Sequence, residues 1–537
     1  MAYDYIIVGA GSAGCVLANR LSQDTTLRVA LVEAGGRDLN PWIHVPVGYF
    51  KTMHDPKTDW CYKSEPDPGI NNRSLDWPRG KVLGGSSSIN GLLYVRGQPQ
   101  DFDGWAQMGC SGWSYDDVLP LFKRAETCEM GASEHRGGDG PLAVSQIRVK
   151  SPLSEAFINA AVEMGVPRTN DYNGPVQEGV AYFEQTARNG FRCSTAKANL
   201  IPIRKHRKNL DVITKAQAMG LTFDETTGRE ATGLRISRDG VEQILRLKDG
   251  GEVILSAGAI GSPQLLEVSG IGRGDVLQNA GVGVRVEAPE VGENLQDHLQ
   301  IRLVYEVNVP TLNDAINRLV PRMGIALNYA LRRKGPMSLG ASQVAIFARS
   351  MESLETPDIQ FHFQPLSADK PGIEMHPFSG MTSSVCQLRP DSRGHIHIAS
   401  GDAKVYPKIV PNYLDAMSDQ LCAIRAVKFA RAMTKTKALG PLVAREHVPD
   451  APPKSDEDHL EVARNLSQTI YHPTSTCRMG PDPRAVVDTR LRVNGVKGVR
   501  VADASIMPRI TSGNTNAPTI MIGEKASDMI LEDRKAR

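Results

Sequence analysis

A glycine-rich turn near the N-terminus constrains the fold of this chain more than any other feature. The stretch YIIVGAGSAG places a short β-branched and aromatic run, Tyr5–Val8, before three glycines, Gly9, Gly11 and Gly14, and the overlapping segment Ser12–Leu21 has helical periodicity. In such a turn the first glycine permits a tight bend and the second lets the backbone approach a pyrophosphate. The third lets helix and strand pack closely. The sequence therefore predicts a unit that holds the ADP half of a dinucleotide at a helix N-terminus.

An acidic residue supports this prediction. Glu33 ends a second apolar run, RVALVE, about twenty residues after the turn, where a carboxylate can accept hydrogen bonds from ribose hydroxyls. An acceptor at this position favours a ribose without a 2′-phosphate. A GxGxxG pattern by itself is weak, so the flanking strand, the helix and the spaced acid carry the prediction. These features alone allow either NAD or FAD.

Composition and length exclude several other classes. The chain has 537 residues, room for several domain-sized units, and its net charge of +2 gives no electrostatic reason to bind nucleic acid. Eight scattered cysteines without a CxxC pair predict free thiols. The first strand begins at once, which leaves no room for a signal peptide, and no apolar run approaches the ~18 residues of a membrane span. We expect a cytoplasmic monomer or homodimer, with peripheral contact at the inner membrane left open.

Several later segments have recognisable local patterns. Gly80–Gly97 is rich in glycine and serine before an apolar stretch, as at a helix N-terminus or nest that offers backbone N–H groups to a ligand. Strands are expected at Leu210–Thr214 and Glu252–Ser256. A helix is expected to follow the second strand, with Ser262 as N-cap and Pro263 in its first turn.

The middle of the chain changes character. Alternation in Ile359–Pro365 and His395–Ser400 predicts antiparallel strands with one covered face, in a separate sheet-containing domain between about residues 300 and 433. In the C-terminal part we expect a buried strand within Val499–Ser505 and a final helix over Ala517–Leu531.

Six motifs in a fixed order identify a family resemblance. They are GAGSAG near the N-terminus, PRGKVLGGSSSINGLLYVRG at 78–97, GAIGSPQLLEVSGIG at 258–272, NLQDH at 294–298, YHPTSTCRMG at 471–480 and VADASIMP at 501–508. Together they resemble the glucose-methanol-choline (GMC) oxidoreductase family of FAD enzymes over essentially the whole chain. The resemblance is greatest to its bacterial choline-dehydrogenase-like and aliphatic or polyether alcohol dehydrogenases, and it implies FAD rather than NAD.

The resemblance implies an α/β fold with two discontinuous domains. A Rossmann-like FAD-binding domain would comprise residues 1–155, 190–300 and 463–537. A substrate-binding domain with an antiparallel sheet would comprise residues 156–189 and 301–462.

The resemblance also implies which residues hold FAD. The AMP and pyrophosphate portion would be held by Gly9, Gly11, Gly14 and Glu33, with Ala218 at the adenine. The ribityl chain and flavin edge would lie along Gly84, Gly85, Ser86, Asn90 and Gly91, and the flavin ring near Asn516 and Thr519. Further FAD contacts would be Ser12, Ala13, Ala34, Arg79, Asp503 and Ala504. Some relatives link the flavin covalently through a histidine in the serine-rich motif. That position is Ile89 here, so we expect noncovalent FAD.

Alcohol oxidation needs a base, because loss of the hydroxyl proton makes the neighbouring C–H bond a far better hydride donor. Histidine supplies a suitable pKa with little adjustment. His472 matches the catalytic histidine of the family in YHPTSTCRMG, and Asn514 in SGNTNAP matches the second member of the catalytic pair. An amide there can orient the substrate oxygen without competing for the proton. The hydride would pass to flavin N5.

The other histidines are interpreted more cautiously. His298 in NLQDH is taken as structural, and His362 either lines the substrate cavity or packs in the core. His395 and His397 alternate on one strand without a third ligand at suitable spacing, so no metal site is expected. The sequence contains no nucleophile elbow, Walker loop or zinc signature.

The sequence gives less direct information on the substrate and on the electron acceptor. Choline-type relatives commonly place a carboxylate near the flavin, whereas Met337–Arg349 contains none and Gln343 occupies the expected position. We therefore predict oxidation of a neutral aliphatic, aromatic or polyether primary alcohol to the aldehyde, with a quinone or other electron-transfer acceptor. The alternatives are an alcohol oxidase that uses O₂ and produces H₂O₂, a choline dehydrogenase, a non-redox flavoprotein lyase and a non-enzymatic dinucleotide-binding protein.

Overall fold

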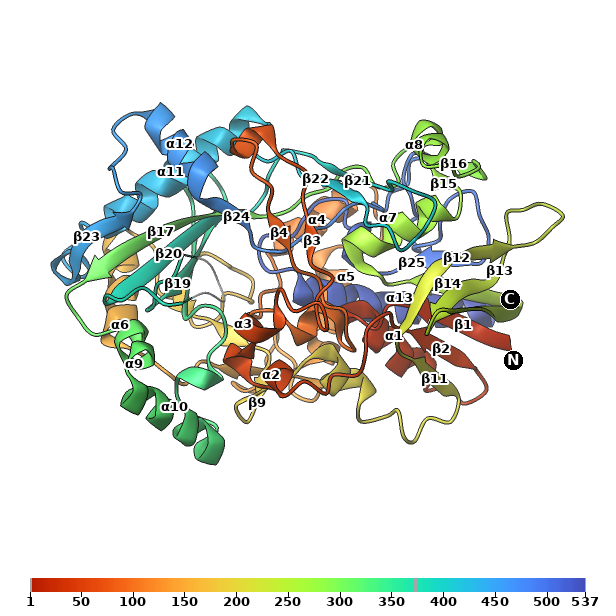
Figure 1. Ribbon diagram of the computed structural model, residues 1–537, viewed down its shortest axis with the longest axis horizontal. Coiled ribbons are helices and arrows are strands. Elements are labelled where there is room, and N and C mark those ends of the chain that lie inside the picture. The colour runs from red at the N-terminus through yellow and green to blue at the C-terminus, as the bar shows by residue number, and fades with distance from the viewer. Residues whose placement is uncertain (1, 370–373, 537) are drawn as a thin grey trace.

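Two seven-stranded sheets lie towards opposite ends of the long axis of the molecule (Figure 1). The structure is a computed structural model, and it describes residues 2–369 and 374–536. The expected fold class, a Rossmann-like sheet joined to an antiparallel substrate-domain sheet, is confirmed. No helix in these described ranges is long and apolar enough to cross a bilayer.

The first sheet contains the glycine-rich turn. Its strand order is β11-β2-β1-β14-β13-β12, with β25 also paired to β14. Its strands are β1 (Ala2–Val8), β2 (Val29–Val32), β11 (Leu210–Ile213), β12 (Ala216–Phe223), β13 (Ala231–Arg238), β14 (Val241–Leu255) and β25 (Val499–Val501). β11, β2, β1, β14 and β25 run parallel. β13 pairs antiparallel with β14, and β12 pairs antiparallel with β13 at the edge of the sheet. The four residues of β2 are all buried, as expected for a parallel strand covered on both faces.

Two helices from opposite ends of the sequence cover this sheet together. α1 (Ser12–Leu21) packs against α13 (Asn516–Ala536), and the described termini lie close together (Figure 1). The close approach requires Gly523, where a Cβ would lie 3.0 Å from Ala13 Cα. The fully buried carboxylate of Glu524 accepts from Arg20 of α1 at 2.8 Å, and it forms an ion pair with Arg124 of α5 (Tyr115–Ala125), also at 2.8 Å. The N-terminal motif is thus held in place by residues from the other end of the chain.

The second sheet is antiparallel and forms one wall of the candidate site. Its order is β23-β17-β20-β19-β18-β7, with β24 also paired to β17. The strands are β7 (Gly179–Tyr182), β17 (Leu299–Val307), β18 (Val344–Ala348), β19 (Ile359–Gln364), β20 (Gly380–Gln387), β23 (Val443–Val448) and β24 (Ser467–Thr469). One face carries apolar residues such as Leu303, Phe361 and Val385 in a shared core with α6 (Pro152–Glu163), α11 (Met417–Met433) and α12 (Asp456–Leu466). The other face is more polar and turns towards the first domain.

The remaining elements are short or peripheral. The helices are α2 (Pro41–His44), α3 (Tyr49–Thr52), α4 (Pro99–Gln107), α7 (Gly258–Val268), α8 (Gly274–Asn279), α9 (Leu312–Asn317) and α10 (Leu319–Arg332). The minor strands are β3 (Tyr62–Lys63), β4 (Asp76–Trp77), β5 (Glu126–Cys128), β6 (Leu142–Gln146), β8 (Glu184–Gln185), β9 (Ala187–Arg188), β10 (Phe191–Arg192), β15 (Ile271–Gly272), β16 (Val286–Glu287), β21 (His395–His397) and β22 (Lys408–Val410).

One predicted helix start is wrong. α7 begins at Gly258 rather than after Ser262, so Pro263 lies inside the helix. Proline lacks the N–H that would bond the carbonyl of Ala259, and the hydroxyl of Thr476 donates to that carbonyl instead, at 2.7 Å. The Ser262 hydroxyl donates to Asp503 Oδ2 at 2.6 Å, which brings the helix start to the last part of the chain.

Candidate active site

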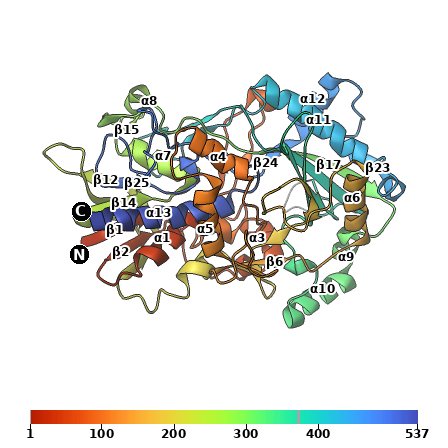
Figure 2. The ribbon, with the colours of Figure 1, turned by 180° about the vertical axis from the view of Figure 1, so that it is seen from behind.

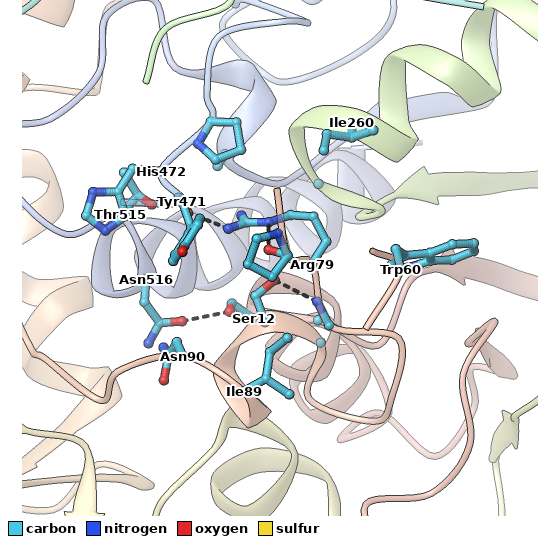
Figure 3. Close-up of a pocket in the computed structure, with 18 of the residues that line it drawn as sticks. Ser12, Trp60, Arg79, Ile89, Asn90, Ile260, Tyr471, His472, Thr515 and Asn516 are labelled. Atoms are coloured by element: carbon cyan, nitrogen blue, oxygen red, sulfur yellow. Dashed lines mark hydrogen bonds between the residues drawn. The ribbon is translucent and has the colours of Figure 1, made fainter. Parts of the chain in front are cut away.

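A single cavity of about 350 Å³ extends from the β1–α1 turn to the polar face of the second sheet. Of the residues predicted for cofactor binding or catalysis, all but Gly14 and Gly84 line it: Gly9, Gly11, Ser12, Ala13, Glu33, Ala34, Arg79, Gly85, Ser86, Asn90, Gly91, Ala218, His472, Asp503, Ala504, Asn514, Asn516 and Thr519. Segments more than five hundred positions apart in the sequence therefore form one site, as the side-chain view in Figure 3 illustrates.

The glycines at the first end have two different roles. A Cβ at Gly14 would lie 1.9 Å from the carbonyl oxygen of Gly9, so this position serves the packing of helix on strand. A Cβ at Gly11 would have no protein atom nearer than 4.0 Å, because this glycine faces the cavity. α1 has no side-chain N-cap, so its N-terminus retains free N–H groups and partial positive charge. These features suit the pyrophosphate of a dinucleotide such as FAD.

Glu33 lines the cavity and also accepts hydrogen bonds from backbone N–H groups in and near the turn. Its Oε2 accepts from the Ala10 N–H at 2.9 Å and its Oε1 from the Gly35 N–H at 2.8 Å. Burial raises its pKa to about 7, although these backbone N–H groups oppose the shift. A carboxylate has about four acceptor positions, so hydrogen bonds to ribose hydroxyls remain available, and that role stays a prediction.

The serine-rich motif packs directly onto the glycine-rich turn. Gly85 has φ +52°, and a Cβ there would lie 2.7 Å from Gly11 Cα, so a side chain is excluded on both counts. Ser12 Oγ donates to Asn516 Oδ1 at 2.7 Å, and Figure 3 shows these side chains directed towards each other. Arg79 donates at 2.5 Å to the carbonyl of Tyr471, which precedes the predicted base His472 in sequence. The two ends of the site are thus joined by hydrogen bonds.

Two histidines and two amides form a chain of hydrogen bonds at the second end. His472 Nδ1 lies 3.0 Å from His298 Nδ1, and His472 Nε2 lies 3.1 Å from Asn514 Nδ2. Asn514 Oδ1 accepts from Gln360 Nε2 at 3.3 Å. The backbone N–H of His472 donates to Asp297 at 2.7 Å, which fixes the loop that carries the ring.

The direction of this chain follows from one carbonyl group. His298 Nε2 lies 2.9 Å from the carbonyl of Leu388, which can only accept, so Nε2 carries the proton. His298 is neutral because burial lowers its pKa to about 4, so its Nδ1 must accept from His472 Nδ1–H. His472 Nε2 is then left with its lone pair, facing the Asn514 amide N–H. His298 therefore sets the tautomer of the predicted base, a contact that the structural interpretation of His298 did not include.

The protonation state of His472 is consistent with a base. Burial lowers its pKa well below 6.5, and His298, His362 and Arg79 lower it further. Nε2 is therefore unprotonated throughout the neutral pH range and can accept a hydroxyl proton during the reaction.

The substrate-domain wall is polar and carries a positive charge. Arg302 of β17 and His362 of β19 both stand opposite Ser384 of β20, and all three line the cavity beside Gln300 and Gln364. Arg302 donates to the carbonyl of Ala368 at 3.2 Å, and no carboxylate of a described residue forms an ion pair with it. His362 stacks on Phe183, and its Nε2 has no hydrogen-bond partner among the described groups. His362 thus contacts the core and also faces the cavity.

Some sequence expectations for this wall were wrong or incomplete. Gln343 does not line the cavity, because its Oε1 accepts from Ser154 at 2.6 Å on the other side of the strand. Gln300 and Arg302 were missed, although they alternate with the apolar residues Ile301 and Leu303 and could have been recognised from that pattern. Other residues of the cavity wall, such as Tyr49, carry no sequence signal that separates them from core residues.

His397 has a different role from a metal ligand. Its ring nitrogens lie 2.6 Å from Glu267 Oε1 and 3.0 Å from Glu293 Oε1. Burial alone would lower its pKa, but these carboxylates raise it to about 9. Within residues 2–369 and 374–536 no group of three His, Cys, Asp or Glu side chains is arranged to hold a metal ion.

Comparisons with known proteins agree with this geometry. Family models described as GMC oxidoreductase match residues 3–300 and 390–523. The chain is 42% identical over 531 residues to an alcohol dehydrogenase [acceptor] of Pseudomonas putida, covering 98% of this chain and 96% of the relative. It is 40% identical over 541 residues to the mitochondrial choline dehydrogenase of Homo sapiens, covering 98% and 89%. The crystal structure of pyridoxine 4-oxidase from Mesorbium loti superposes with a TM-score of 0.89 at 31% identity, covering 99% of both chains.

Proposed function

The chain belongs to the GMC oxidoreductase family, and from that premise we propose that it oxidises a primary alcohol to the aldehyde with noncovalent FAD, passing electrons to a quinone or another acceptor other than O₂. The observation that carries the proposal is the unprotonated Nε2 of His472, which accepts a hydrogen bond from the Asn514 amide at one end of the cavity.

The reaction needs three contributions from this chain. Asn514 Nδ2–H orients the alcohol oxygen towards His472, and His472 Nε2 accepts the hydroxyl proton. The His298 acceptor keeps the opposite ring nitrogen of His472 protonated throughout. Bound FAD supplies the hydride acceptor.

The charge of the cavity wall favours an uncharged alcohol over choline. Among the described residues, Glu33 and Asp503 are the only carboxylates that line the cavity, and both already bind backbone or hydroxyl donors of the first domain. On the substrate side the charged group is the guanidinium of Arg302, which repels a quaternary ammonium group. Arg302, rather than Gln343, is thus the residue of this wall that disfavours choline.

Two features support the remaining parts of the proposal. Ile89 lines the cavity where some relatives carry the histidine that links the flavin, and its side chain offers no nucleophile. The 42% identical relative is named as a dehydrogenase that uses an acceptor, which favours that class over an oxidase.

Anaerobic stopped-flow reduction of the holoenzyme tests the proposal. Mixing with primary alcohols of increasing length should bleach the visible flavin band, whereas choline should bleach it slowly. His472→Ala should retain FAD and slow bleaching by about 10²–10⁴-fold, the usual contribution of a general base. If no alcohol in a broad panel bleaches the flavin, the proposed reaction is wrong.

Two further measurements test the acceptor and the cofactor linkage. Reduced enzyme should reoxidise faster with a soluble quinone than with O₂, and the reverse order would indicate an oxidase. Acid denaturation followed by filtration should release all of the yellow colour, and colour retained with the protein would contradict noncovalent binding.

A further inference from the structure

Helix α10 exposes an unusual amount of apolar surface. It lies at the periphery of the substrate domain and projects from the body in both Figures 1 and 2. Five of its large apolar side chains are solvent-exposed: Leu319 (61%), Val320 (80%), Met323 (63%), Leu327 (60%) and Leu331 (74%). Contiguous apolar surface of this kind on a folded protein usually marks an interaction site.

These side chains form one face that points away from the protein. At 100° per residue, Leu319, Met323, Leu327 and Leu331 lie in a single stripe. Tyr329 is on the opposite side, where it is buried and its hydroxyl donates to the Gly190 carbonyl at 2.9 Å. The stripe is therefore not a face that the helix uses to pack on its own domain.

The charge around the stripe has one sign. No Asp or Glu occurs between Asp314 and Glu352, a stretch that includes the whole helix. The same stretch contains Arg318, Arg322, Arg332, Arg333 and Lys334 in and beside the helix. None of these five forms an ion pair with a carboxylate of the described residues, although Arg318 lowers the pKa of Asp314 electrostatically. The helix and its flanks therefore carry a net positive charge.

This charge identifies the kind of partner. If a second copy of the chain covered the stripe in a two-fold symmetric dimer, the same basic residues of the two copies would face one another and repel. A bilayer that contains anionic lipids buries the apolar stripe and neutralises the arginines with phosphate groups at the same time.

Two short turns connect α10 to the wall of the cavity. α10 packs against the turn Pro336–Ser338, which in turn packs against the turn Pro46–Gly48. Each turn leads within a few residues to the cavity wall, at Ala341 and at Tyr49. A surface bound to α10 would therefore lie close to this side of the cavity.

We propose that α10 is an interfacial anchor that docks the protein reversibly on anionic bilayers. The helix lies in the plane of the interface, with Leu319, Met323, Leu327 and Leu331 among the upper acyl chains and the flanking arginines at the lipid phosphates. This binding is separate from the alcohol chemistry, so it can be tested without measuring activity.

Vesicle flotation of the FAD-loaded protein tests the proposal. The protein should float with phosphatidylcholine vesicles that contain phosphatidylglycerol and much less with phosphatidylcholine alone. Leu327→Glu/Leu331→Glu should lower partitioning by at least about tenfold, because two apolar contacts are lost and two acids repel the lipid. Arg318→Glu/Arg322→Glu should remove the preference for anionic lipid.

A matched control separates the anchor from general surface hydrophobicity. Met417 and Leu421 are also exposed and four residues apart, on α11. Met417→Glu/Leu421→Glu should bind vesicles like the wild type, and all variants should keep FAD and the rate of dye reduction. No flotation with anionic vesicles, or flotation unaffected by Leu327→Glu/Leu331→Glu, overturns the proposal. So does self-association in solution that this variant abolishes, which would assign the stripe to a second copy.

Discussion

At His472, the chemistry depends on which ring nitrogen carries the proton, and a carbonyl that His472 does not touch determines it. Leu388 fixes the proton on His298 Nε2, and His298 then fixes the proton on His472 Nδ1. A wrong tautomer would point an N–H at the substrate oxygen and leave no acceptor for the hydroxyl proton.

This relay predicts different results for two substitutions of His298. His298→Ala removes the acceptor and should slow flavin reduction by about a hundredfold with FAD retained. His298→Asn can offer its Oδ1 near the same position and should recover most of the rate. Stopped-flow reduction of both variants provides the test, and equal rates for the alanine variant and the wild type would contradict the relay.

The depressed pKa of His472 predicts an acid-tolerant reductive step. Because Nε2 becomes protonated only well below pH 6.5, the rate of flavin reduction should stay flat as the pH falls through 6.5 and decline only in more acidic solution. The limiting rate constant measured against pH gives the result. An acid limb centred at or above pH 6.5 would show that the base is not held as the structure indicates.

At the scale of the elements, two glycines of the β1–α1 turn have different roles: one allows close packing, and the other faces the cavity. Gly14 is confined by the Gly9 carbonyl, whereas Gly11 faces open space. A methyl group added at Gly14 would therefore overlap protein backbone, whereas one added at Gly11 would enter the cavity.

The two alanine variants should consequently behave differently. Gly14→Ala should destabilise the protein by about 1–3 kcal/mol, since its Cβ overlaps the backbone. Gly11→Ala should change the stability of the FAD-free protein by less than about 0.5 kcal/mol and weaken FAD binding by about tenfold or more. Denaturant unfolding of the apoprotein and FAD titration measure the two effects. An equal loss of stability in both variants would rule out this division.

The same elements show what sequence could predict. Residues 12–21 form the helix that the periodicity predicts, because the glycine turn, the apolar pattern and the packing of the helix all favour the same structure. α7 differs, because its internal proline is tolerated only through the Thr476 hydroxyl, more than two hundred residues away. Likewise, the pairing of His298 with His472 joins two motifs that lie far apart in sequence. Local patterns predict local structure, whereas partners supplied by distant segments depend on the fold.

In the whole molecule, the cavity is built from both ends of the chain and from both domains. A ligand that binds only this assembled site stabilises the native state according to its concentration and affinity. The assignments of individual residues to FAD, and the domain boundaries expected from the sequence, remain predictions that cofactor binding can test.

Removal of FAD should therefore lower stability measurably. At free FAD about a hundredfold above its Kd, the holoprotein should be more stable than the apoprotein by about 2.7 kcal/mol. Thermal unfolding at several FAD concentrations measures this gain, and Gly11→Ala should require more FAD for the same shift. A melting temperature that does not depend on FAD concentration would contradict an assembled cofactor site.

The hydrogen bond between Ser12 and Asn516 also has a consequence for synthesis. Asn516 of α13, the helix that covers the first helix and lines the cavity, is translated 504 residues after Ser12. A nascent chain that ends before this helix has the nucleotide-binding motif without the wall that closes over it. If FAD occupies this cavity, we expect it to be enclosed only after α13 has been synthesised and has packed on the first helix, so the unloaded N-terminal motif has to persist until then.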